Sequence, residues 1–192
     1  MEWMKQVGDV LDRYGDATPN RPAEMVQTDF DLFARNAPPA AVSEGLAAAF
    51  RSDQTPEFAQ MASQLFGRAS GPQRAGMLNA LLATLGPIVL QQILARRQRG
   101  PTSGTAPGGG GLGDVLGKIL RGDGPPKVTP EVAEQVTPQE VEEIAREAEK
   151  KDPSVIDRIS EIYAQQPQLL KVLGGAALAI ALGRMAQRRN TL

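Results

Sequence analysis

The chain has 192 residues, an apolar fraction of 41% and a net charge of −1 from 21 basic and 22 acidic side chains. This length and apolar fraction suffice to fill a core, which excludes a wholly disordered chain. A net charge near zero excludes a long-range electrostatic attraction of the whole chain to nucleic acid, so no nucleic-acid partner is expected. Cysteine is absent, which excludes disulfides and favours a reducing compartment, so we expect a cytoplasmic protein.

The first 99 residues carry apolar side chains at the spacing of an α-helix. This period predicts about six short helices and no sheet. The residues that define them are Trp3, Val7, Val10, Leu11 and Tyr14; Val26, Phe30 and Phe33; Val42, Leu46 and Phe50; Phe58, Met61, Leu65 and Phe66; Met77, Leu78, Leu81, Leu82 and Leu85; and Ile88, Val89, Ile93 and Leu94. Residues 1–99 are therefore predicted to form an N-terminal helical domain.

Helix starts are marked by a capping residue followed by proline. A Thr or Asp oxygen accepts from an orphaned backbone N–H, and proline at the first helical position loses no hydrogen bond there. The pairs are Thr18-Pro19, Thr55-Pro56, Thr129-Pro130, Thr137-Pro138 and Asp152-Pro153. Thr137 and Glu140 also match the capping-box pattern, in which the two residues cap each other's backbone N–H groups.

Residues 100–127 are predicted to be a Gly/Pro-rich linker, because such a composition buries little and behaves as a flexible coil. Leu112, Val115, Leu116, Ile119 and Leu120 predict a short amphipathic helix at 112–120 inside it. Residues 108–113 match GxGxxG, but the dinucleotide fingerprint requires a preceding strand, which residues 101–107 cannot supply. No nucleotide cofactor is therefore expected.

Residues 128–192 are predicted to form a small C-terminal helical domain, which makes the whole chain an all-α protein. Its most charged helix is expected to lie with its acidic residues in solvent, paired with cations four positions away. The expected pairs are Glu142 with Arg146 and Glu147 with Lys151. A domain of this size has a marginal core, so it is expected to need a partner or the first domain.

Catalytic chemistry is not expected from this composition. The chain has no histidine and no cysteine, so the commonest general base and the usual ligands of zinc, haem-thiolate and iron–sulfur sites are missing. We find no nucleophile–base pair and no metal-ligand spacing. The prediction is a protein that is not an enzyme, with no catalytic residue, no metal, no cofactor and no small-molecule substrate.

The last predicted helix, which opens at Pro167, is apolar on nearly every side. Such a helix lies in a core, against a partner or second copy, or in a membrane, and all three placements stay open. Gly175, Ala179 and Gly183 are spaced four apart and form a smooth strip on which another helix can approach closely. Because glycine inside a helix is unfavourable, we predict that this strip is a helix–helix contact.

Arginines close the same helix at Arg184, Arg188 and Arg189. One interpretation is that these cations complement the helix dipole at its C-terminus. The other is contact with phosphate groups, which on a membrane would be lipid headgroups. A membrane surface is therefore a second candidate partner, beside the protein itself or another protein.

The Gly-rich lead into Leu112-Gly113-Asp114-Val115-Leu116-Gly117-Lys118-Ile119-Leu120 and the Thr-Pro helix starts in residues 128–141 resemble the YidB-like group of small bacterial proteins. That resemblance implies no reaction and no functional residues. The function expected is a non-enzymatic bacterial structural or interaction protein that acts through helix packing, including self-association. The alternative is a peripheral membrane protein that inserts its C-terminal helix.

Overall fold

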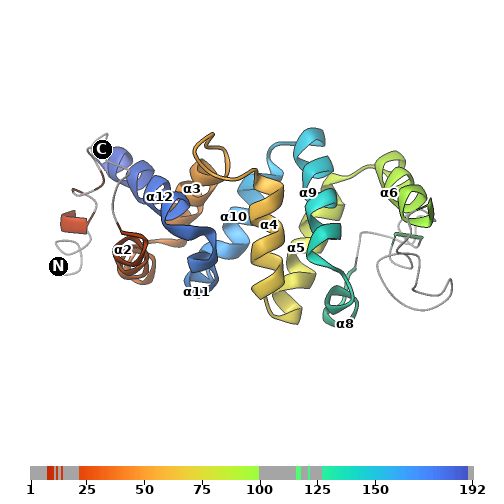
Figure 1. Cartoon of the computed structure of the whole chain (residues 1–192), viewed down its shortest axis with the longest axis horizontal. Helices are drawn as coiled ribbons and strands as arrows, with labels where there is room; N and C mark the ends of the chain where they lie inside the picture. Colours follow the sequence, from red (N-terminus) through yellow and green to blue (C-terminus); the bar gives the residue numbers. More distant parts are fainter. Residues whose placement is uncertain are drawn as a thin grey trace. The chain divides into compact units, whose positions relative to one another are not determined.

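The computed structural model describes residues 8–10, 12, 14, 22–99, 116, 117, 121 and 127–189. These residues contain helices and no strand, so the all-α prediction is confirmed for this part of the chain. The helices, in chain order (Figure 1), are α2 (Ala23–Asn36), α3 (Pro39–Phe50), α4 (Phe58–Arg68), α5 (Gly71–Thr84), α6 (Pro87–Arg99), α8 (Pro130–Glu134), α9 (Pro138–Lys151), α10 (Val155–Ala164), α11 (Pro167–Leu170), the 3-10 helix η1 (Lys171–Leu173) and α12 (Gly174–Arg189).

The predicted helix starts are met to different degrees. The capping box at the start of α9 is present, since Thr137 Oγ1 accepts from the Glu140 N–H at 3.3 Å and Glu140 Oε2 accepts from the Thr137 N–H at 2.9 Å. Thr55 instead donates to the carbonyl oxygens of Ala49 and Ser52 and closes the loop before α4. An N-cap residue lies directly before the first residue of its helix, and α4 begins at Phe58. Thr55 and Pro56 are therefore too far upstream to be the cap and the first helical residue of α4.

Two compact units divide the chain. Unit 1 comprises Met1–Leu65 and Ile156–Leu192, and unit 2 comprises Phe66–Val155. These boundaries differ from the expected domains at 1–99 and 128–192. The Gly/Pro-rich composition identifies chain that buries little, but it carries no information on which helices at its two ends pack together. Within the predicted linker only residues 116, 117, 121 and 127 are described, and the predicted helix at 112–120 otherwise lies outside the described residues.

Unit 1 places helices from both ends of the chain side by side. The last helix, α12, packs along α3 and also contacts α2, while α11 contacts α2. Amphipathic spacing explains which side faces inward, because each helix buries the apolar residues that recur every three or four positions. The buried side chains include Val26, Phe30, Phe33, Val42, Leu46, Phe50, Met61, Ile159, Tyr163, Leu170, Leu178 and Leu182.

Unit 2 is organised around α5, which packs against α8 and α9 (Figure 1). Asn79 on α5 uses its amide to bind the backbone of Val128, just before α8. Its Oδ1 accepts from the Val128 N–H at 2.8 Å, and its Nδ2 donates to the Val128 carbonyl at 3.3 Å. Val128 is buried and non-helical, so this side chain supplies the backbone hydrogen bonds that no helix provides there.

Ser160 on α10 is a buried hydroxyl in the core of unit 1. Its side chain is 0% exposed, and its Oγ has no hydrogen-bond partner among the described residues. An unsatisfied buried hydroxyl costs roughly 1–3 kcal/mol. We therefore expect Ser160→Ala to raise the free energy of unfolding by about 1 kcal/mol in urea denaturation.

The matched control is Ser63→Ala on α4, because Ser63 Oγ donates to the Gln60 carbonyl at 2.9 Å. The same chemical change should give no gain in stability there. A Ser160→Ala variant less stable than the wild type would contradict this prediction, because it would show that the Ser160 hydroxyl makes a stabilising hydrogen bond.

Candidate functional site

The candidate site is the C-terminal segment of α11, η1 and α12. It is the one helical segment within the described ranges that is long and apolar enough to cross a membrane, with 21 residues from Pro167 to Gln187 and a mean hydropathy of 1.6 over its most apolar 18 residues. In unit 1, however, 44% of its most apolar stretch is buried. Length and composition alone therefore do not decide between core and membrane placement of this segment, which depends on its contacts.

α12 is apolar but its surface is not uniform. The inward face consists of side chains at positions i, i+1, i+4 and i+5 along the helix, which are Ala177, Leu178, Ala181, Leu182, Met185 and Ala186, all buried. On the other side Ala176, Arg184 and Gln187 are exposed and Ile180 is half-buried. The helix is therefore buried on one face and largely exposed on the other.

The closest approach on this inward face occurs at Gly45 of α3. A Cβ atom at Gly45 would lie 2.9 Å from the carbonyl oxygen of Ala181 and would run into the side chain of Met185. Only glycine admits this separation between the backbones of α3 and α12. Gly45 was not among the predicted packing residues, although a glycine in the middle of an Ala-rich helix is a recognised signal of close helix packing.

The predicted strip lies beside this face rather than on it. A Cβ atom at Gly175 would lie 2.9 Å from both Cα and Cβ of Ala23, at the start of α2, and one at Gly183 would lie 3.5 Å from the Tyr14 carbonyl oxygen. Ala179 is half-buried. Two of the three strip residues thus face neighbours within unit 1.

The three arginines are in the last two turns of α12. Arg184 is exposed, and its guanidinium lies 3.5 Å from Gln187 Oε1, at the limit of a hydrogen bond. Arg188 and Arg189 are helical, and their side chains lie outside the described residues. An exposed cation at the end of a helix agrees with both the dipole interpretation and the phosphate interpretation.

The start of the segment is tied to α2 by polar contacts. Lys171 Nζ lies 2.6 Å from Asp31 Oδ2, and Gln27 Nε2 donates to the Lys171 carbonyl at 3.5 Å. The Asp31 side chain is only 20% exposed, so water screens this ion pair less than a fully exposed one. We call Lys171, Asp31 and Gln27 the clasp.

A second ion pair in unit 1 joins the loop after α3 to α10. The Arg51 guanidinium lies 2.9 and 2.7 Å from the two carboxylate oxygens of Asp157. These hydrogen bonds lower the pKa of Asp157 below its ordinary value, against the opposing effect of desolvation. Both side chains are about half exposed, at 43% and 51%, so the pair contributes less than about 1 kcal/mol.

The lowered pKa predicts a pH dependence of stability. The stabilisation is present at pH above the ordinary aspartate pKa, near 4, and is lost as pH falls through the lowered folded value. We expect Asp157→Asn to lower the free energy of unfolding by about 0.5 kcal/mol at pH 7. The difference from wild type should shrink below pH of about 4, measured by urea denaturation across pH.

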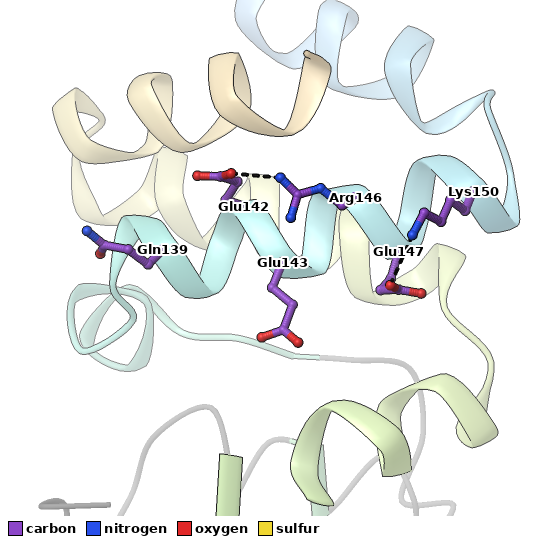
Figure 2. Close-up of a pocket in the computed structure, with 6 residues that line it drawn as sticks. All are labelled: Gln139, Glu142, Glu143, Arg146, Glu147 and Lys150. Carbon is purple, nitrogen blue, oxygen red and sulfur yellow. Dashed lines mark hydrogen bonds and ion pairs between the residues drawn. The ribbon is translucent and has the colours of Figure 1, made fainter. Parts of the chain in front are cut away.

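Unit 2 presents a charged helix surface rather than an enclosed site. Figure 2 shows six side chains of α9 that line an open hollow of about 600 Å³, namely Gln139, Glu142, Glu143, Arg146, Glu147 and Lys150. The predicted pair of Glu142 and Arg146 is present at 2.8 Å. Glu147 pairs with Lys150 at 3.5 Å and not with Lys151, because position i+3 also lies on the same helix face.

No group of three or more Asp or Glu side chains among the described residues is arranged to hold a metal ion. A second hollow of about 510 Å³ lies between α3 and α10 and is equally open. The chain matches no family model, no curated protein and no solved structure. The resemblance to the YidB-like group therefore stays a prediction, and any function has to be argued from the surfaces themselves.

Proposed function

We propose that this protein is a non-enzymatic interaction protein that associates with a second copy of itself through the outer face of α2. On that face Met25 is 50% exposed and Leu32 is 37% exposed. The two residues are seven positions apart, so they project from the same side of the helix. Neighbouring exposed apolar side chains on one helix face are the kind of surface that protein interfaces use.

The opposite face of α2 supports this role, because it holds the helix rigidly in place. Val26, Phe30 and Phe33 are buried, with at most 3% of each side chain exposed. An interface helix that is already ordered loses little conformational entropy on association. Full burial of an apolar side chain of this size contributes about 1.5–3 kcal/mol, of which Met25 and Leu32 have about half or less still to gain. The two side chains therefore anchor the contact, and the residues around them have to add to it to offset the cost of association.

Size-exclusion chromatography with light scattering tests this proposal. The variant Met25→Glu with Leu32→Glu should shift the wild-type oligomer to monomer and leave the far-UV circular dichroism unchanged, since both positions are exposed. Ile88→Glu is the matched control, because Ile88 on α6 is 70% exposed and no second large apolar side chain is exposed among the described side chains of that helix. A wild-type monomer at all concentrations, or equal effects of both variants, would contradict the proposal.

A second candidate function is attachment to a membrane by the segment Pro167–Gln187. Its 21 residues and the mean hydropathy of 1.6 over its most apolar stretch support this candidate, as do the arginines at its end. Under the first proposal the protein is cytoplasmic, and under this one it is membrane-associated. Flotation of the full chain with phosphatidylglycerol vesicles tests it, and a protein that stays at the bottom of the gradient would rule it out.

A further inference from the structure

We propose that residues Pro167–Gln187 are a releasable segment that leaves unit 1 and crosses a lipid bilayer as one continuous helix, with Gly174 as its hinge. This inference rests on the second candidate function, membrane attachment. It adds a mechanism, because the segment as folded in unit 1 is neither continuous nor free.

Gly174 interrupts the segment. Its backbone has φ of 81° and ψ of 165°, a conformation open to glycine and strained for any other residue, and it separates η1 from α12. A Cβ atom at Gly174 would meet nothing within 4 Å. Crowding therefore does not explain this glycine, whereas its backbone conformation does. Rotation of this one residue into the helical region would join α11, η1 and α12.

The joined helix has the dimensions of a bilayer. Its 21 residues would extend about 30 Å, which equals the thickness of the hydrocarbon core. The charged residues within it are Lys171 near one end and Arg184 near the other. Their long side chains can reach the headgroups on opposite sides while the residues between them stay in the apolar interior.

The contacts that hold the segment in unit 1 are of two kinds. The clasp binds Lys171 to Asp31 by an ion pair at 2.6 Å, which weakens at high salt or on an anionic surface that competes for the lysine. Beyond the hinge, the Gly45 backbone locks against Ala181 and Met185. Release therefore requires the inward face of α12 to exchange its apolar contacts with α3 for contacts with lipid.

A disulfide that fastens α12 to α3 tests the release directly. The chain has no cysteine, so Gly45→Cys with Met185→Cys gives a single defined bond. A Cβ at position 45 would lie 3.0 Å from Met185 Cγ, so a slight outward shift of α12, which the contact of this Cβ with the Ala181 carbonyl oxygen requires, leaves the two Cβ atoms within bonding reach. Gly45→Cys alone carries the same shift without the bond and is a second control. The oxidised and reduced forms are floated with vesicles of phosphatidylglycerol and phosphatidylcholine and then washed with alkaline carbonate, which removes proteins that are only adsorbed.

The expected result is that the reduced protein floats and resists carbonate, whereas oxidation lowers the carbonate-resistant fraction about tenfold or more. Met185→Cys alone should show no dependence on oxidation. Equal flotation and carbonate resistance of the oxidised form would overturn the release while membrane attachment stands. No flotation in either form or in the wild type would overturn both.

Should cysteine at position 45 prevent folding, a second lock uses Ala23→Cys with Gly175→Cys, which fastens the start of α12 to α2. The Cβ positions of these residues are 2.9 Å apart and need to separate slightly to accept the bond. The same loss of carbonate-resistant protein on oxidation is expected. Unchanged resistance with this lock closed would overturn the proposal independently of the first lock.

Discussion

Gly45→Leu is expected to lower the free energy of unfolding by about 2 kcal/mol or more, a large fraction of the roughly 5–15 kcal/mol that is typical of folded domains. Leucine would gain almost 1 kcal/mol of helix propensity over glycine. Against this gain, the new Cβ alone would lie 2.9 Å from the Ala181 carbonyl oxygen, which belongs to backbone and cannot rotate away. Overpacking dominates, so α12 has to shift off α3.

Gly76→Ala is the comparison that isolates packing from propensity. Gly76 also lies inside a helix, α5, but a Cβ there would meet nothing within 4 Å. This variant is therefore expected to gain up to about 1 kcal/mol. Both free energies are measured by urea denaturation followed by circular dichroism. A Gly45→Leu variant as stable as the wild type would mean that α3 and α12 do not meet at this point.

Leu178→Ala is expected to lower the free energy of unfolding by about 3 kcal/mol. Leu178 is 0% exposed on the inward face of α12, so truncation removes apolar burial and leaves a cavity that the surrounding helices fill only partly. Calorimetry or urea denaturation measures the loss. The change also tests the core placement of α12, since a side chain facing lipid or solvent leaves no cavity when it is shortened.

The control for this cavity is Ile180→Ala on the same helix. Ile180 is half-buried and lies on the other side of α12. Its truncation should cost less than about 1 kcal/mol because water or a neighbouring side chain takes the vacated space. Equal losses at Leu178 and Ile180 would contradict the division of α12 into an inward and an outward face.

These stability effects bear on the two functional proposals in different ways. Association through Met25 and Leu32 leaves α12 in place, so it should tolerate a closed disulfide between α3 and α12. Insertion into a bilayer requires that α12 leave, so it should not. The oxidised double-cysteine variant therefore separates the two functions in one protein.

The local structure of this protein could be predicted from sequence because it depends on neighbouring residues. The 3.6-residue period located the helices from α2 to α6, and the Thr137 and Glu140 pattern located the capping box at the start of α9. The pair of Glu142 with Arg146 followed from its spacing on one helix. In each case the interacting groups are within four positions of each other, so no knowledge of the fold was needed.

Which helices pack together was decided only in the tertiary structure. The Gly/Pro-rich residues suggested that the two halves fold apart, yet α12 packs on α2 and α3, and α8 and α9 pack on α5. The glycine that matters most for this packing, Gly45, is opposite a residue more than a hundred positions away. The interruption at Gly174 was not predictable either, because a glycine admits both its observed φ of 81° and a continuous helix.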